Sequence, residues 1–223
     1  MAQQHDGQGV KVRIVNIVAV TALQSPFSLA KLKAVYPFAG ENCLTHIAVS
    51  HERSYFAIFS TGKVLSFSSK SILGLEDAFT WLRAFLAQFG LKLSNSYEIV
   101  NVVGVLQTTT PLDLLVLGRV LPHSAYEPPS DLGLYDYHRQ INALIYHFAP
   151  SPIRSRQTAL IFSTGRVVLT GFKSIEILKM KAHLLADQIA QIVTSHPSVL
   201  AEERVPLARR SPNIRSHPMG AES

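Results

Sequence analysis

Amide, aromatic and cationic side chains recur at matched places in the two halves of this chain. Residues 58–64 read IFSTGKV and return at 161–167 as IFSTGRV, while residues 14–18 read IVNIV and return at 99–103 as IVNVV. An amide donates and accepts hydrogen bonds, an aromatic ring stacks or packs, and a cation pairs with anions. The recurring set therefore predicts noncovalent binding rather than bond-making chemistry.

No catalytic or metal-binding arrangement is indicated by the remaining reactive side chains. The histidines lack metal-ligand spacing, and no nucleophile, base and orienting group follow one another in a recognisable order. His46 and His51, five residues apart in an expected strand region, should lie on opposite faces. The single cysteine, Cys43, excludes a disulfide framework and a cysteine-rich metal site. We expect no enzyme, no metal, no cofactor and no small-molecule substrate.

The composition is that of a globular protein. Of the 223 residues, 16% are charged and 47% hydrophobic. The formal net charge of +6 makes a polyanion a plausible partner, although several basic residues fall in an expected tail. No apolar run reaches the ~18 residues that a membrane span requires, and residues 1–10 lack a signal-peptide core. We therefore expect a soluble protein of a reducing compartment, with no membrane partner.

The matched segments indicate a tandem duplication. Their spacings of 103 and 85 residues imply a unit of roughly 85 residues, with about 18 extra residues inside the second copy. Two copies are too few for a solenoid, so one fused pseudo-twofold domain is predicted. Its parts are a flexible arm at 1–10, repeat 1 at 11–95, repeat 2 at 96–194, and a basic disordered tail at 195–223.

Each repeat predicts the same order of elements: a strand, a short helix, about four strands and a long helix. Strands are expected at 11–21, 43–50, 54–60 and 63–69. Ser25-Pro26 and Thr110-Pro111 open the short helices, with Ser25 as N-cap. The long helices are expected from Leu75 to Gly90 and from Ser174 to Thr194. The fold class is α+β: a curved antiparallel sheet of about ten strands with both long helices on its convex face.

One face of such a sheet is left without helices. Val15, Ile17, Phe59, Val64 and their counterparts cannot all point toward the helices, so apolar groups must also line the open face. A broad exposed apolar face marks a binding surface. Because a twisted sheet curves, we expect a concave saddle.

The two copies resemble the conserved core of the TATA-box-binding protein (TBP) family. The family pattern in each repeat is I-x-N-[IMV]-V, then L-x-L opening a helix, then L-I-F-x-S-G-K-[MIV]-V-x-T-G-A-K-S before the long helix. Residues 160–174 read LIFSTGRVVLTGFKS, residues 57–71 read AIFSTGKVLSFSSKS, and SAYEP at 124–128 is similar to the family's S-S-Y-E-P. The resemblance covers about residues 11–194, with both repeats in order.

The resemblance implies a general transcription initiation factor, a divergent TBP or TBP-related factor, that binds promoter DNA in the minor groove. The asparagines would hydrogen-bond central base pairs, the apolar residues would line the groove floor, the phenylalanines would wedge base steps, and the cations would face phosphates. These implied DNA-binding residues are Asn16, Val18, Phe59, Lys63, Leu65 and Lys70 in repeat 1, and Asn101, Val103, Ile141, Leu160, Phe162, Arg166, Val168, Thr170 and Lys173 in repeat 2.

The resemblance also implies partners and a location. The family nucleates a preinitiation complex in the nucleus, through IIB-like and IIA-like general factors and other initiation-complex subunits. Tyr126 and Glu127 match the segment that contacts the IIB-type factor. Around Trp81 the first long helix is apolar where the family is rich in Lys and Arg, which leaves two readings open: packing on the sheet, or a hydrophobic docking surface.

The departures from the family lie mainly in repeat 1. Phe67-Ser68 replaces the Thr-Gly of the pattern, Ala57 replaces a leucine, and the second wedge phenylalanine aligns near Asn42, with Ile141 at the matching place in repeat 2. The loop through 131–137 is longer than the family's, and an extension lies at 150–154. An alternative function is therefore a TBP-fold protein-interaction scaffold with little direct DNA binding. An enzyme built on this fold is a third reading that the residues do not support.

Overall fold

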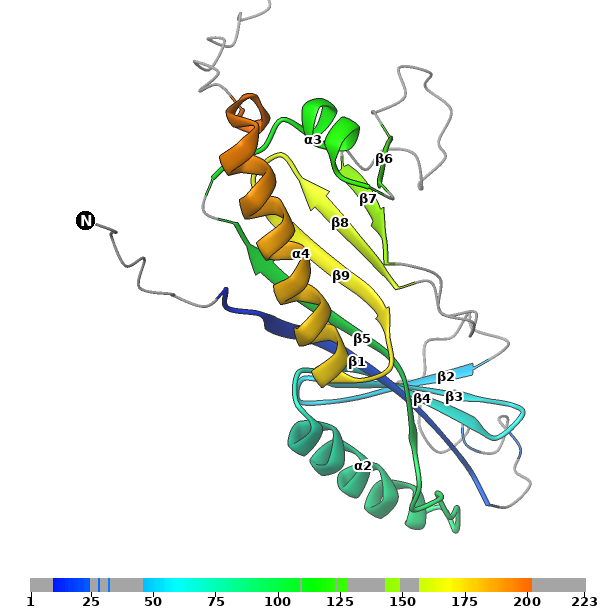
Figure 1. The fold of residues 1–223 in the computed structure, drawn as a ribbon. Helices are drawn as coiled ribbons and strands as arrows, with labels where there is room; N and C mark the ends of the chain where they lie inside the picture. Colours follow the sequence, from blue (N-terminus) through cyan, green and yellow to red (C-terminus); the bar gives the residue numbers. More distant parts are fainter. Residues whose placement is uncertain are drawn as a thin grey trace, which may run out of the picture.

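Nine strands and three α-helices make up the described part of this chain in a computed structural model (Figure 1). The structure describes residues 10–24, 28, 32, 46–108, 110–122, 143–148 and 157–201, and the backbone of 124–127. The strands are β1 (Arg13–Ala22), β2 (His46–His51), β3 (Ser54–Phe59), β4 (Lys63–Ser69), β5 (Glu98–Gln107), β6 (Ser124–Glu127), β7 (Ala143–His147), β8 (Thr158–Phe162) and β9 (Arg166–Phe172). The helices are α2 (Ile72–Ala87), α3 (Leu114–Val120) and α4 (Ile175–Ser195), followed by the 3₁₀ turn η1 (Pro197–Val199).

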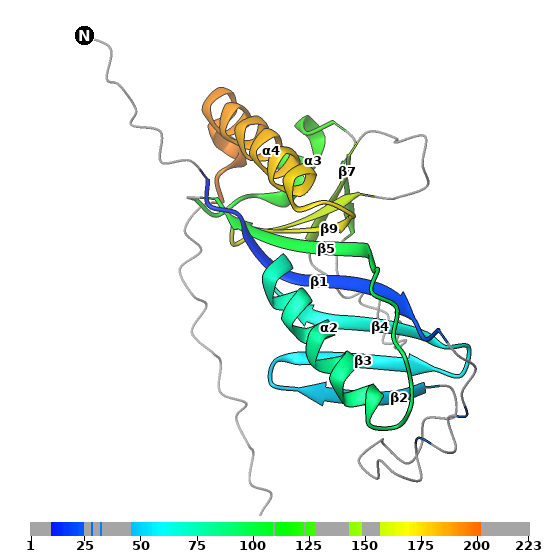
Figure 2. The same ribbon diagram turned by 90° about the horizontal axis from the view of Figure 1, so that it is seen from below.

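All nine strands belong to one antiparallel sheet in the order β2-β3-β4-β1-β5-β9-β8-β7-β6. The first strand of each repeat, β1 or β5, lies at the centre, so each repeat extends outward from a shared seam (Figure 2). The sequence predicts about ten strands, and the described residues form nine. In repeat 1 the place that β6 occupies in repeat 2 falls on residues 33–45, outside the described residues. The early part of the expected strand at 43–50 lies there too.

The alternation of burial along the strands separates two faces of the sheet. In β1 the side chains of Ile17, Ala19 and Thr21 are buried, whereas those between them are half-buried. The buried face carries the helices: a Cβ added at Gly104 of β5 would lie 2.6 Å from Cδ2 of Leu178 on α4. Figure 2 shows α2 and α4 on the same side of the twisted sheet. The opposite face, the open face, bears no described helix.

Matched serines begin both long helices. The Ser71 hydroxyl accepts a hydrogen bond from the Gly74 amide at 3.0 Å, and the Ser174 hydroxyl accepts one from the Ile177 amide at 3.2 Å. α2 therefore begins three residues before the Leu75 expected from the sequence. Gly90, at φ +69°, ends the turn that follows α2, as predicted.

The expected start of the second short helix at Thr110-Pro111 is wrong. α3 begins at Leu114, because the Asp113 carboxylate accepts hydrogen bonds from the Leu115 and Val116 amides at 2.9 and 3.1 Å. The corresponding start at Ser25-Pro26 lies outside the described residues.

Residues 195–201, predicted from the sequence to begin a disordered tail, pack against the rest of repeat 2. α4 continues to Ser195, Val199 is fully buried, and the Asp113 amide donates to the Val199 carbonyl at 2.7 Å. Leu200 then forms a bridge with Leu112. Hydrophobic burial thus holds this segment. Residues 1–9 and 202–223 lie outside the described residues. No described helix is both long and apolar enough to span a bilayer.

The two repeats fill matched core positions with side chains of opposite size. In repeat 1, Phe56 of β3 and Phe79 of α2 are fully buried, and β4 contributes the small Ser66 and Ser69. The counterparts in repeat 2 are Ala159, Ala182, Leu169 and Phe172, in the same order. Because total core volume must be conserved for close packing, large residues on the strand of one repeat correspond to small residues in the other.

Matched bulges interrupt the two strand pairs nearest the seam. The β1–β4 register shifts between Ile17 and Ala19, and the β5–β9 register shifts between Val102 and Gly104. The bulged residues are Ser68, at φ +74°, and Gly171, at φ +84°. Only glycine adopts such a backbone without steric cost, so the bulge is strained in repeat 1 and relaxed in repeat 2.

The substitution Ser68→Gly should therefore stabilise the protein by about 1 kcal/mol. Gly171→Ser, the same exchange in the opposite direction, should destabilise it by a similar amount. Denaturant unfolding of both variants beside the unaltered chain measures the two changes. Loss of stability in Ser68→Gly would show that the serine side chain contributes more than its backbone strain costs.

Candidate functional site

The centre of the open face is a four-residue cluster related by the pseudo-twofold axis. In the β1–β5 pairing Asn16 lies opposite Val103, and Val18 lies opposite Asn101. All four side chains are half-buried on the face away from the helices. The two asparagines are therefore diagonal to each other across the β1–β5 seam, and so are the two valines, at the middle of the sheet.

Each asparagine uses its side-chain oxygen to hold a bulge. Asn16 Oδ1 accepts a hydrogen bond from the Ser68 amide at 2.8 Å, and Asn101 Oδ1 accepts one from the Gly171 amide at 2.9 Å. The Nδ2 of Asn101 approaches Thr170 Oγ1 only at 3.5 Å, and the Nδ2 of Asn16 has no partner among the residues described. Because the oxygens are occupied, each amide offers its NH₂ group, a donor, to a ligand on the open face.

Apolar and small polar side chains flank the cluster in repeat 2. Leu160 of β8 lies opposite Val168 of β9, and Thr158 lies opposite Thr170. All four are half-buried on the open face. This half presents a smooth surface of aliphatic groups and threonine methyl and hydroxyl groups.

The same positions in repeat 1 are filled differently. Ala57 lies opposite Leu65, and Tyr55 lies opposite Phe67 with ring centroids 5.9 Å apart. Aromatic rings therefore replace both threonines of repeat 2, and an alanine replaces Leu160. The pseudo-twofold symmetry of the backbone is not shared by the shape of the open face.

The two phenylalanines of the repeated motif end matched strands. Phe59 ends β3 beside His46, with ring centroids 5.4 Å apart, and Phe162 ends β8 opposite Ala143. Both rings are half-buried, as expected of side chains that have one side free. Ile141, the second wedge position of repeat 2, lies outside the described residues.

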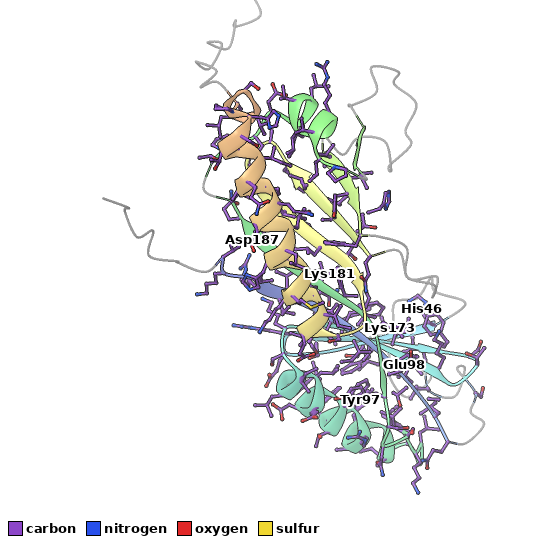
Figure 3. The ribbon with its side chains drawn as sticks, viewed as in Figure 1. His46, Tyr97, Glu98, Lys173, Lys181 and Asp187 are labelled. Atoms are coloured by element: carbon purple, nitrogen blue, oxygen red, sulfur yellow. The ribbon has the colours of Figure 1, made fainter. Side chains whose placement is uncertain are left out.

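The four cationic side chains expected to contact DNA differ in whether they are paired with a carboxylate. Lys63, Lys70 and Arg166 are exposed, whereas Lys173 Nζ bonds Glu98 Oε1 at 2.8 Å (Figure 3). The hydrogen bond and charge of Lys173 lower the pKa of the Glu98 carboxyl. In repeat 1 the position that matches Glu98 is Arg13, so this ion pair has no counterpart there.

Similarity to known proteins agrees with this geometry. The family model described as "Transcription factor TFIID (or TATA-binding protein, TBP)" matches residues 96–192. A TATA-box-binding protein of Methanothrix thermoacetophila is 26% identical over 190 residues, which cover 81% of this chain and 96% of the relative. The solved structure of Methanococcus jannaschii TBP matches with a TM-score of 0.62 at 22% identity, over 82% of this chain and 99% of that one. Together these similarities support a divergent TBP family member.

A further relative shows how far this divergence extends. The TATA-box-binding protein of Pyrococcus furiosus is 27% identical over 177 residues, covering 76% of this chain and 84% of the relative. The family model matches only the second half, which agrees with the departures on the open face of repeat 1. The TBP-like fold is thus present over both halves, and the family sequence pattern is stronger in repeat 2.

The expected partner-binding residues of this TBP relative are only partly described. The backbone of Tyr126 and Glu127 forms β6, and their side chains lie outside the described residues. Trp81 is half-buried on α2, stacked on His51 at 4.0 Å and on Phe85 at 5.1 Å between ring centroids. Among the neighbouring apolar side chains, Phe79, Leu82 and Leu86 of α2 are buried. Phe85 of α2 and Phe89, in the turn after it, are half-buried.

Among the described residues, no three His, Cys, Asp or Glu side chains come together in a group that could hold a metal ion. His46 lies beside Phe59 on the open face and His51 stacks on α2, so the two occupy opposite faces, as predicted.

Several features of the open face were not predicted from the sequence. The alternation of β1 and β5 also places Val20 and Val105 there, which the period-two pattern could have indicated. The Glu98–Lys173 ion pair could not be found in this way, because Glu98 begins β5 and Lys173, 75 residues later, follows the end of β9.

The asparagine–bulge hydrogen bonds predict different effects for two substitutions of Asn101. Asn101→Ala removes the acceptor of the Gly171 amide and should cost about 1–2 kcal/mol of stability. Asn101→Asp keeps an oxygen acceptor and should retain most of it. Denaturant unfolding distinguishes them, with Asn16→Ala and Asn16→Asp as the matched pair in repeat 1. Equal losses for alanine and aspartate would contradict the structural role of the amide oxygen.

Proposed function

We propose that this chain is a transcription initiation factor whose open face binds promoter DNA in the minor groove. The observation that carries the proposal is the central cluster, in which two asparagines hold their oxygens inward and offer NH₂ donors beside two valines. The floor of the minor groove presents acceptors, adenine N3 and thymine O2, to such donors. TATA-box-binding relatives over most of the chain support the same function.

The surroundings of the cluster suit a deformed duplex. Leu160, Val168 and Thr170 would lie against sugars and base edges, and Phe162 and Phe59 would enter base steps from the two ends. Unstacking a base step costs a few kcal/mol, which the larger contact area of a bent duplex offsets. The exposed Lys63, Lys70 and Arg166, and Lys173 once it leaves Glu98, would contact phosphates.

The two repeats should contribute unequally to DNA binding. Phe67 and Tyr55 occupy the positions that Thr170 and Thr158 hold in repeat 2, so repeat 1 presents two rings where a shallow floor is needed. We therefore place the stronger half of the interaction in repeat 2, with Leu65, Val18 and Asn16 adding the contacts that remain in repeat 1.

Protein partners complete the proposal. Tyr126 and Glu127 would bind a IIB-like factor, a IIA-like factor and other initiation-complex subunits would join elsewhere, and Trp81 with Phe85 would add an aromatic docking surface on α2. Chromosomal DNA is the site of action of the family, and we place this member in the nucleus. A second candidate, a TBP-fold scaffold with little direct DNA contact, is favoured by one observation, the aromatic rings on the open face of repeat 1.

Substitution of the two phenylalanines tests the proposal. Phe162→Ala should reduce both affinity for a short promoter duplex and its bending more than Phe59→Ala does, because the face around Phe162 better matches the groove. Fluorescence anisotropy reports affinity, and energy transfer between the duplex ends reports bending. The unaltered chain should lose affinity as salt rises, since phosphate contacts release counterions. Binding without salt dependence, or no binding, would favour the scaffold.

Removal of the Glu98 charge tests whether Lys173 contacts a DNA phosphate. Glu98→Gln should free Lys173 for a phosphate, strengthen duplex binding and steepen the slope of log affinity against log salt by about one unit. Asp187→Asn on α4 removes the same charge from an exposed site on the helical side and is the matched control. Equal slopes for the two variants would mean that Lys173 does not contact DNA.

A further inference from the structure

The repeat 1 half of the open face carries two aromatic rings at positions where repeat 2 has threonines. Tyr55 of β3 lies opposite Phe67 of β4, with ring centroids 5.9 Å apart. The matched pair in repeat 2 is Thr158 and Thr170. Tyr55 is 39% exposed and is the only aromatic residue among the exposed large hydrophobic residues of the described chain. We call Tyr55 and Phe67 the aromatic pair.

The aromatic pair lies next to the central cluster. Leu65 and Phe67 are half-buried and Ser66 between them is fully buried, so both larger side chains face away from the helices. Phe67 directly precedes Ser68, whose amide donates to Asn16 Oδ1 at 2.8 Å. A nucleic acid held at Asn16 therefore also meets the aromatic pair. The inference drawn below rests on the proposed function, DNA binding by the open face.

The charges around the aromatic pair favour a nucleic acid as its ligand. Among the described residues of β1–β4, the positions on the open face carry no carboxylate, and Lys63 at the start of β4 is exposed. Aromatic rings beside a cation are the combination that binds unpaired nucleic acid, because the rings stack on bases and the cation contacts the backbone. Rings on the open face of an antiparallel sheet form such a platform.

The relative orientation of the two rings does not suit a paired duplex. Their planes are inclined by 52° to each other, whereas successive base pairs in a duplex are stacked nearly parallel. The minor groove also presents base edges, and not base faces, to a protein. Bases that have left the duplex can be splayed apart and can turn their faces to aromatic side chains. Only unpaired bases therefore use the faces of both rings.

We propose that repeat 1 stacks unpaired bases on Tyr55 and Phe67, so that the chain prefers promoter DNA that is open over one half of its site. A base that is already unpaired costs little to take out of the stack, and the aromatic pair selects it for that reason. Repeat 2, with Thr158 and Thr170 in place of the rings, remains on the paired half. The open half of the site thereby sets the direction in which the chain binds.

Fluorescence anisotropy of the full chain with two probes tests this preference. One probe is a short, fully paired A·T-rich duplex, and the other has the same sequence with adjacent thymine–thymine mismatches in one half. The opened duplex should bind about tenfold more tightly, because base–aromatic stacking adds to the contacts that both probes share. The fluorescent adenine analogue aminopurine, placed at an unpaired position, should lose fluorescence at saturation because stacking quenches it.

The double variant Tyr55→Thr/Phe67→Thr gives repeat 1 the residues of repeat 2. It should lose most of the preference and the quenching, and it should bind the paired duplex no more weakly than the unaltered chain. Phe89→Thr is the matched control, because it removes a ring from the helical side, where Phe89 packs edge-on against Phe85 at 5.2 Å between ring centroids. It should keep the preference. Far-ultraviolet circular dichroism verifies the fold of both variants.

The possible failures separate this inference from the proposed function. Equal affinity for the two probes would overturn the inference and leave minor-groove binding intact. A preference that persists undiminished in the double variant would also overturn it, since the flexibility of the opened duplex would then be the cause. If the chain binds neither probe, both proposals fail, and the aromatic pair is better explained as a contact for a protein partner.

Discussion

Two side chain-to-backbone hydrogen bonds at the seam of the sheet determine how its open face is presented. Asn16 and Asn101 accept from the amides of Ser68 and Gly171, and these amides belong to bulges that would otherwise leave them without partners. The same bonds orient both amide groups with NH₂ outward. One constraint thus stabilises the strand pairs beside the seam and sets the hydrogen-bonding character of the surface, so stability and recognition depend on the same two residues.

Among the described residues, duplication gave this fold four matched pairs of strands and one matched pair of long helices, and divergence then acted on side chains more than on backbone. The N-cap serines, the turn glycines Gly62 and Gly165, and the bulges remain matched in both repeats. The core volumes are exchanged instead, with rings on β3 and α2 of repeat 1 and on β9 of repeat 2. Such exchanges preserve packing density while they alter the surfaces nearby.

The open face shows the same separation between backbone symmetry and side-chain asymmetry. Tyr55 and Phe67 match two threonines of repeat 2, and Arg13 matches Glu98. A ligand that approaches this face therefore meets a shallow aliphatic half and a more aromatic half with a different charge at the rim. In a fused pseudo-dimer such differences define a direction along the sheet, which two identical halves could not do.

The sequence by itself determined the duplication, the order and approximate bounds of most elements, and the alternation that brings Asn16, Val18, Asn101 and Val103 to one face. These follow from local periodicity and from matched motifs. Only the tertiary structure decided that the asparagine oxygens are occupied and that Lys173 pairs with Glu98. Those contacts join residues that are 52, 70 and 75 positions apart in the chain. Local sequence propensity does not specify the strand register that brings such distant residues together.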